Sequence, residues 1–164
     1  MERVVNASRT KEKKRADYTP PTFLIDKVDL NFDLRDGETI VTSVMKGRRN
    51  PDGGSTGVLE LCGQNLRLVS LTLDAVAVRE DRYTILDDRL RVDAVPDTFS
   101  LKVITAIVPE ENTALEGLYM SDGMYCTQCE AEGFRRITYF PDRPDVMAVY
   151  TTRIEADAAR FPIL

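Results

Sequence analysis

The chain has 164 residues, 43% of them hydrophobic and 30% charged, which suits one soluble globular domain or one domain with an appendage. Its net charge of −5 and pI near 4.9 disfavour nucleic acid or an anionic membrane as the main partner. No apolar run approaches the roughly 18 residues of a membrane-spanning helix, and residues 1–17 lack the apolar core of a secretory signal.

The N-terminal stretch is polar and basic. Residues 1–21 end in Pro20-Pro21 and have almost no apolar periodicity, so we expect a flexible tail followed by a folded domain over residues 22–164. The basic run between Arg9 and Arg15 leaves a docking or localisation role open, although a solvated tail is the simpler explanation.

The folded part has the apolar period of β-strands. From Val28 to Leu34 every second residue is apolar, and Asp36-Gly37 then signals a turn into a second strand over residues 39–45. No stretch has a convincing long helical period. The spacing predicts an all-β fold, either an antiparallel β-sandwich or twisted antiparallel sheets. Further strands are expected over residues 58–61, 66–73, 82–86, 90–95 and 99–108, with residues 50–57 as a glycine-rich loop.

The pattern changes after Pro109. Residues 121–123 indicate a turn into a segment that contains two cysteines. Apolar residues then recur at helical spacing over residues 134–139, which predicts one short helix near the C-terminal end, and Pro141 must stop it. A final strand is expected over residues 146–152.

Three cysteines, Cys62, Cys126 and Cys129, are an odd number, which favours a reducing, cytoplasmic setting. The Cys126-x-x-Cys129 spacing occurs in redox motifs and in half of many zinc sites. A zinc site would need two further ligands, and the chain has no second such pair and no histidine. A redox role stays open as an alternative, although the acidic residues that follow would not favour a thiolate.

The lack of histidine also excludes Ser-His-Asp and Cys-His catalytic arrangements within this chain. The most informative segment is instead Gln128 to Glu130. If it is extended, the two side chains share one face of a strand. A carboxylate beside an amide can then hold a protonated amine, through the charge of Glu130 and the carbonyl oxygen of Gln128. The structural alternative is that Glu130 pairs with Arg135 or Arg136 and shapes a bend.

Three stretches resemble the N-terminal domain of aminopeptidase N of the bacterial and apicomplexan type, a family of zinc-dependent gluzincin peptidases. They run from Asn112 to Tyr119, from Thr127 to Phe140 and from Asp142 to Ala148. The opening strand after Asp17 also looks like the family's, so the resemblance covers residues 17–164, nearly the whole folded part.

The resemblance implies a mostly antiparallel β domain that packs against a thermolysin-like catalytic domain. That second domain would supply HExxH and a distant glutamate for zinc, together with a GxMEN motif, and this chain contains none of these motifs. The family's Gln-x-Glu motif falls on Gln128 and Glu130, which implies that Glu130 binds the free α-amino group of a peptide substrate. No catalytic residue and no zinc ligand are expected in this chain.

Family members continue beyond the residues that match Pro162-Ile163-Leu164, so we expect an excised domain or a truncation that is inactive without the catalytic domain. We also expect an exposed apolar surface where the catalytic domain docks. The alternative function is a stand-alone β-sandwich module for protein interaction.

Overall fold

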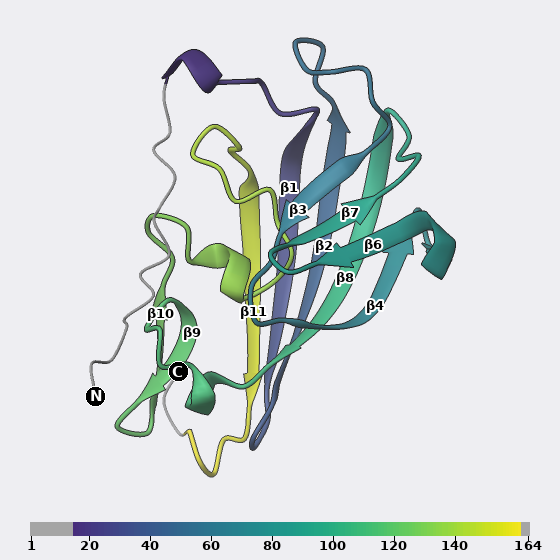
Figure 1. Cartoon of the computed structure of the whole chain (residues 1–164). Helices are drawn as coiled ribbons and strands as arrows, with labels where there is room; N and C mark the ends of the chain where they lie inside the picture. Colours follow the sequence, from purple (N-terminus) through teal and green to yellow (C-terminus); the bar gives the residue numbers. More distant parts are fainter. Residues whose placement is uncertain (1–14, 162–164) are drawn as a thin grey trace, which may run out of the picture.

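The computed structural model describes residues 15–161 and shows two facing β layers with a separate hairpin (Figure 1). The larger layer is a six-stranded sheet, the smaller one has three strands, and the hairpin has two. The strands are β1 (Phe23–Leu34), β2 (Thr39–Arg49), β3 (Leu59–Cys62), β4 (Arg67–Leu73), β5 (Val76–Ala77), β6 (Tyr83–Leu86), β7 (Arg89–Val92), β8 (Thr98–Ile107), β9 (Gly117–Ser121), β10 (Met124–Gln128) and β11 (Val149–Ala156). The described residues also contain four 3-10 turns, of which the first precedes β1 and the others connect strands: η1 (Arg15–Asp17), η2 (Glu80–Arg82), η3 (Pro109–Glu111) and η4 (Phe134–Arg136).

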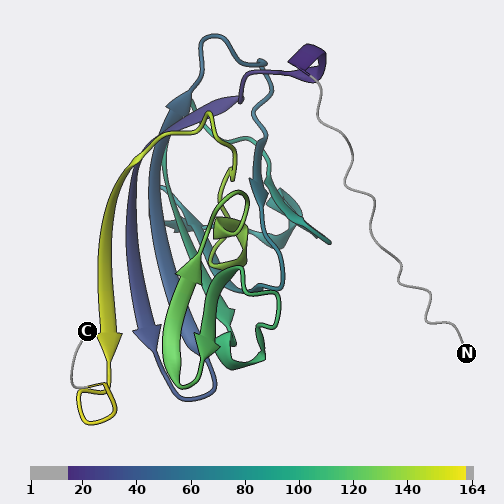
Figure 2. The same cartoon turned by 90° about the vertical axis from the view of Figure 1, so that its left-hand side faces the viewer.

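The large sheet has the strand order β11-β1-β2-β8-β4-β5, and the small sheet has the order β3-β7-β6. Within residues 15–161, every strand pair is antiparallel except β1 with β11, which run parallel. The last strand of the described chain thus pairs with the first. Hairpin β9-β10 stands in front of the large sheet, as Figure 2 shows.

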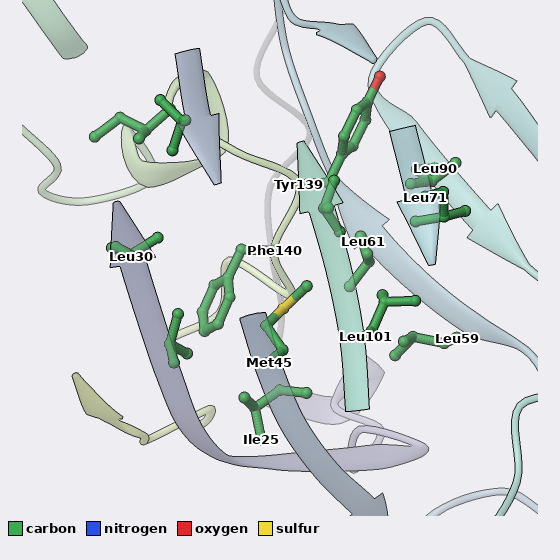
Figure 3. Close-up of a cluster of buried hydrophobic side chains, with 14 of the residues drawn as sticks. Ile25, Leu30, Met45, Leu59, Leu61, Leu71, Leu90, Leu101, Tyr139 and Phe140 are labelled. Atoms are coloured by element: carbon green, nitrogen blue, oxygen red, sulfur yellow. The ribbon is translucent and has the colours of Figure 1, made fainter. Parts of the chain in front are cut away.

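The core lies between the inner face of the large sheet and a cover made of the small sheet and residues 137–140 (Figure 3). Alternate side chains of β1, β2 and β8 point into it, because successive side chains of a strand face opposite ways. Each fully buried aliphatic side chain contributes about 1.5–3 kcal/mol. Figure 3 labels ten members of this core: Ile25, Leu30, Met45, Leu59, Leu61, Leu71, Leu90, Leu101, Tyr139 and Phe140.

The all-β prediction is confirmed, and the two C-terminal elements differ from it in extent. The expected short helix is the single 3-10 turn Phe134–Arg136, because Ile137 and the residues after it leave the turn to enter the core. The final strand begins at Val149 instead of residue 146. Val146 is buried in a turn, where its N–H donates to the carbonyl of Arg143 at 3.2 Å.

The N-terminal tail was predicted over residues 1–21, and its first 14 residues lie outside the described residues. Residues 15–20 are exposed and include the turn η1. Between residues 15 and 161, no helix has the length and apolar character needed to cross a membrane.

Candidate functional site

Gln128 and Glu130 lie together at the end of the hairpin. Strand β10 ends at Gln128, so Glu130 occupies the turn that follows instead of an extended strand. The Gln128 side-chain amide donates to the backbone carbonyl of Glu130, with 3.2 Å between nitrogen and oxygen. Both side chains are exposed. This bond engages the amide nitrogen and leaves the side-chain oxygen of Gln128 as the available acceptor.

The structural alternative for Glu130 required an ion pair with one of two arginines, and both have other partners. Arg135 pairs with Asp142 at 2.9 Å and with Glu132 at 3.3 Å. Arg136 pairs with Glu116 at 3.1 Å. Among the described residues, none forms a hydrogen bond or ion pair with the Glu130 carboxylate. Its charge is therefore available to a cation from outside the domain.

Two glycines let the turn pack closely against the hairpin. Gly133 donates its N–H to the carbonyl of Cys129 at 2.9 Å, and an added Cβ would lie 2.4 Å from the carbonyl oxygen of Gln128. Gly117, the β9 partner of Gln128, has φ +72° and would place a Cβ 2.7 Å from the Cβ of Arg136. Side chains at either position would push the turn away, so its place beside β9 depends on both glycines.

A nearly buried ion pair fixes the other side of the turn. The Arg135 and Asp142 side chains are only 14% and 11% exposed. Arg135 donates to Asp142 three times: from Nε and the backbone N–H to Oδ2, and from the guanidinium to the carbonyl, at 2.9, 3.2 and 3.0 Å. Burial lowers the pKa of the Arg135 guanidinium, but its bond to Asp142 and nearby negative groups raise it overall. The arginine thus stays charged and holds the turn to residue 142.

The same segment is joined to the core by main-chain contacts. Cys62 and Phe140 exchange two backbone hydrogen bonds of 2.7 and 3.1 Å, and Gln64 donates to the carbonyl of Arg135 at 2.9 Å. The Thr105 hydroxyl donates to the carbonyl of Ile137 at 3.1 Å. The residues that follow the Glu130 turn are therefore bonded to β3, to Gln64 and to β8, although the turn itself is exposed.

The cysteines give little support to a redox role. Cys62, Cys126 and Cys129 are all free thiols. Cys129 packs against the core, and burial, followed by the charge of Asp142, raises the pKa of its thiol. A raised pKa keeps the thiol protonated, whereas a reactive cysteine needs a thiolate. In the part of the chain that the structure describes, no three Cys, Asp or Glu side chains are grouped to hold a metal ion.

An aromatic cluster lies directly beside the turn. The ring of Phe134 meets the rings of Phe140 and Tyr150 edge-on, with centroids 5.0 and 5.9 Å apart. Partial burial, helped by Asp142 and Cys129, raises the pKa of Tyr150 to about 12. The sequence placed Tyr150 in a final strand and Asp142 just after the proline that ends the expected helix, and neither pattern indicated that both residues border the Glu130 turn.

Gln128 and Glu130 lie outside both of the main cavities among the described residues. The larger cavity, of about 440 Å³, is lined by residues of β4, β8 and η3 together with Leu118 and Arg136. The smaller one lies over β2 and β8 near Phe99. The predicted amine site is thus an open surface that presents two acceptors and no wall on its outer side.

Comparison with known proteins identifies relatives of this domain. Residues 80–163 match the family model described as the Peptidase M1 N-terminal domain. Aminopeptidase N of Caulobacter vibrioides is 48% identical over 149 residues, which cover 91% of this chain and 17% of that protein. The resemblance noted in the sequence is thereby confirmed.

Solved structures share the fold. Aminopeptidase A of Legionella pneumophila, in complex with aspartic acid, has a TM-score of 0.85 at 32% identity, over 92% of this chain and 18% of that chain. A variant M1 zinc metallopeptidase from Deinococcus radiodurans, bound to a Tyr-Ser-Ala substrate, has a TM-score of 0.66 at 18% identity, over 81% and 32% of the two chains. This chain spans 17% of the length of the Caulobacter relative. With a family match over half of its residues and such a relative along nearly all of them, the chain belongs to the peptidase M1 N-terminal domain family.

Proposed function

We propose that this chain is the substrate-recognition domain of a zinc metallo-aminopeptidase, in which Glu130 and Gln128 bind the free α-amino group of a peptide. The observation that carries the proposal is the exposed Glu130 carboxylate, which has no partner among residues 15–161 although two arginines follow it closely. The names of the relatives, aminopeptidase N above all, support a peptide substrate.

The chemistry of the two side chains fits an ammonium group. Glu130 supplies the opposite charge, and Gln128 supplies a directed oxygen because its nitrogen is already bonded to the Glu130 carbonyl at 3.2 Å. A blocked or internal amide brings no charge and leaves the carboxylate without a partner. In a site closed to water, loss of one member of such a pair costs about 3–5 kcal/mol. This difference would restrict cleavage to free N-termini.

Hydrolysis itself is assigned to a thermolysin-like catalytic domain of the same polypeptide, with no zinc ligand from this chain. Zinc bound there would polarise the scissile carbonyl and activate water. The contribution of this domain would be to position the substrate: it would determine which end of the peptide enters the active site and how far that end reaches. We also propose a cytoplasmic location, supported by the odd number of cysteines.

The decisive experiment is Glu130→Ala in the full-length polypeptide. We expect kcat/KM for an alanyl amide to fall by about 100-fold or more, because the ammonium loses its charged partner, with zinc content unchanged. Gln128→Ala should lower it by only about 2- to 10-fold, the value of a neutral hydrogen bond. Glu60→Ala is the matched control, since Glu60 is an exposed carboxylate on the small sheet.

Near-normal activity of Glu130→Ala at full zinc content would refute the assigned role. A larger loss in Gln128→Ala than in Glu130→Ala would reverse the ranking of the two residues. For residues 1–164 alone we expect neither stoichiometric zinc nor peptidase activity, and activity on mixing with the downstream region. Zinc or activity in the isolated chain would contradict the assignment of hydrolysis to the downstream catalytic domain.

A further inference from the structure

The stretch from Asp142 to Ala148 is one of the three that resemble the family, and the chemistry of amine binding does not use it. In the structure it is a loop between Phe140, which pairs with Cys62, and strand β11. Two of its side chains bond to distant parts of the chain. Asp142 accepts from Arg135, which follows the Glu130 turn, and Arg143 donates to the N-terminal segment. The loop therefore connects the turn to the start of the domain.

The first of these contacts holds the main chain of the turn. The N–H of Gly133 donates to the carbonyl of Cys129 at 2.9 Å and closes the turn around Glu130. Asp142 Oδ2 then accepts from both Nε and the backbone N–H of Arg135, at 2.9 and 3.2 Å. The backbone bond fixes a peptide group only five positions after Glu130. A displacement of Asp142 would therefore also displace the turn.

The second contact holds the loop itself. The guanidinium of Arg143 donates to both carboxylate oxygens of Asp145, at 2.8 and 2.6 Å, which fixes its orientation. In this orientation it also donates to the carbonyl of Thr19 at 2.8 Å and lies over the ring of Tyr18, 5.8 Å from the centroid. Asp142 is thus followed directly by a residue that is bonded to the N-terminal segment.

The N-terminal segment is fixed at the point where Arg143 reaches it. Asn50 is 7% exposed and donates from its side chain to the carbonyl of Pro21 at 2.8 Å and from its backbone to that of Thr22 at 2.9 Å. A Cβ added at Gly53 would lie 2.5 Å from the Pro21 carbonyl oxygen. The two prolines at positions 20 and 21 restrict the chain between these contacts and Thr19. The segment can therefore serve as a stationary support.

We propose that Asp142 and Arg143 are positioning residues for amine recognition, which hold the Glu130 turn in place relative to the N-terminal segment. The proposal rests on the proposed function. An exposed carboxylate is located by the anchors of its main chain, because its own side chain makes few contacts. A charge-assisted hydrogen bond spans about 2.7–2.9 Å, and a misplacement of about 1 Å can cost about 100-fold. The two anchors thus set how well Glu130 meets the ammonium group.

The test measures the contribution of the amine to binding by the full-length polypeptide. Alanine hydroxamate and propionohydroxamate differ only in the α-amino group, so the ratio of their calorimetric Kd values reports amine recognition. A smaller fraction of folded protein does not change this ratio. We expect Asp142→Ala to lower it about tenfold, Arg143→Ala about threefold, and Glu130→Ala at least as far as Asp142→Ala. Asp81→Ala is the matched control, since it removes an exposed ion pair with Arg79, and it should leave the ratio unchanged.

A double-mutant cycle separates positioning from a general structural role. If Asp142 acts through Glu130, then Asp142→Ala should change the ratio no further once Glu130→Ala is present. An equal fall with and without Glu130 would overturn the proposal. An unchanged ratio in both Asp142→Ala and Arg143→Ala would also overturn it and leave the proposed function standing. An unchanged ratio in Glu130→Ala would instead count against the proposed function.

Milder changes keep the test decisive if Asp142→Ala does not fold. Asp142→Asn keeps an acceptor oxygen without the charge, so its ratio should lie between those of the parent and Glu130→Ala. Removal of residues 1–19 deletes both partners of Arg143 in the N-terminal segment and should match Arg143→Ala, whereas removal of residues 1–14 retains both partners and should leave the ratio unchanged. Equal ratios for the two shortened proteins would overturn the role of Arg143.

Discussion

Strands β1 and β11 share one face of the large sheet but not one environment. Val28 is 0% exposed, and its register partner Tyr150 is 46% exposed. Phe32 is 8% exposed, and its partner Ile154 is 50% exposed. The cover of the core thus buries the side chains of β1 and only partly covers β11, where Tyr150 contacts Phe134 and Phe140, while the apolar pattern continues. The comparison shows that alternation reports which side chains share a face, and that it does not report what covers the face.

The largest expected loss of stability follows a substitution in the buried core of the large sheet. Leu101 is fully buried at the centre of β8, and Leu101→Ala should destabilise the domain by about 2–5 kcal/mol, because a cavity replaces its contacts. Ile154→Ala on β11 should cost about 1 kcal/mol or less in residues 1–164, since the residue is already 50% exposed. Chemical denaturation of both variants measures the difference. Equal losses would mean that β11 is buried in solution and would end the comparison.

The next largest effect tests whether the ion pair between Arg135 and Asp142 anchors the Glu130 turn to the buried part of the domain. Asp142→Ala should cost about 3 kcal/mol, because it leaves the nearly buried Arg135 charge without its main partner. Asp142→Asn should cost less, since an amide oxygen can still accept from the guanidinium. Asp81→Ala removes an exposed pair with Arg79 and should cost under about 1 kcal/mol. A result for Asp142→Ala as small as for Asp81→Ala would show that the turn is not anchored there.

The smallest effect concerns acid stability near the N-terminal end of the sheet. A hydrogen bond from Arg143, helped by one from Tyr18, holds the pKa of Asp145 below its usual value. A lowered pKa means that the native state favours the ionised form. This stabilisation is present above the usual aspartate pKa and is lost as pH falls through the lower native pKa.

We therefore expect Asp145→Asn to be less stable than the parent near pH 7, by under about 1 kcal/mol, and to lose less stability on acidification. Thermal melts between pH 7 and pH 3 measure how the stability of each protein changes with pH. If the two proteins lost stability equally on acidification, Asp145 would not contribute to the pH dependence of stability.

Much of the sheet could be predicted from the sequence, because its signals are local. The alternation from Val28 to Leu34 and the Asp36-Gly37 turn gave β1, β2 and their hairpin. The parallel pairing of β1 with β11 could not be predicted from periodicity, which carries no information about distant partners.

For the candidate site, too, the local features could be predicted from the sequence and the long-range contacts could not. Gln128 and Glu130 were identified from their types and spacing, and the structure places Gln128 at the end of β10 and Glu130 in the turn that follows, so the expected shared face of one strand is not formed. The partners of Arg135 and Arg136 are set by tertiary packing, which placed Asp142 and Glu116 closer than Glu130. A short-range sequence argument favoured Glu130 as the partner of these arginines, whereas the fold pairs Arg135 with a residue seven positions away and Arg136 with one twenty positions away.

The parallel pairing has a consequence for how the chain folds during synthesis. The start of β11 at Val149 comes 149 − 34 = 115 residues after the end of β1 at Leu34, so β11 is translated long after β1. At about 5–20 residues per second, the ribosome needs roughly 6–23 s to cover this interval. During that time β2 and β8 can assemble with β1, but the outer edge of β1 has no partner. The nascent domain is thus most exposed to wrong strand pairing at its first strand, and a nascent chain stalled before Val149 should bind chaperones or aggregate more readily than one stalled after Ala156.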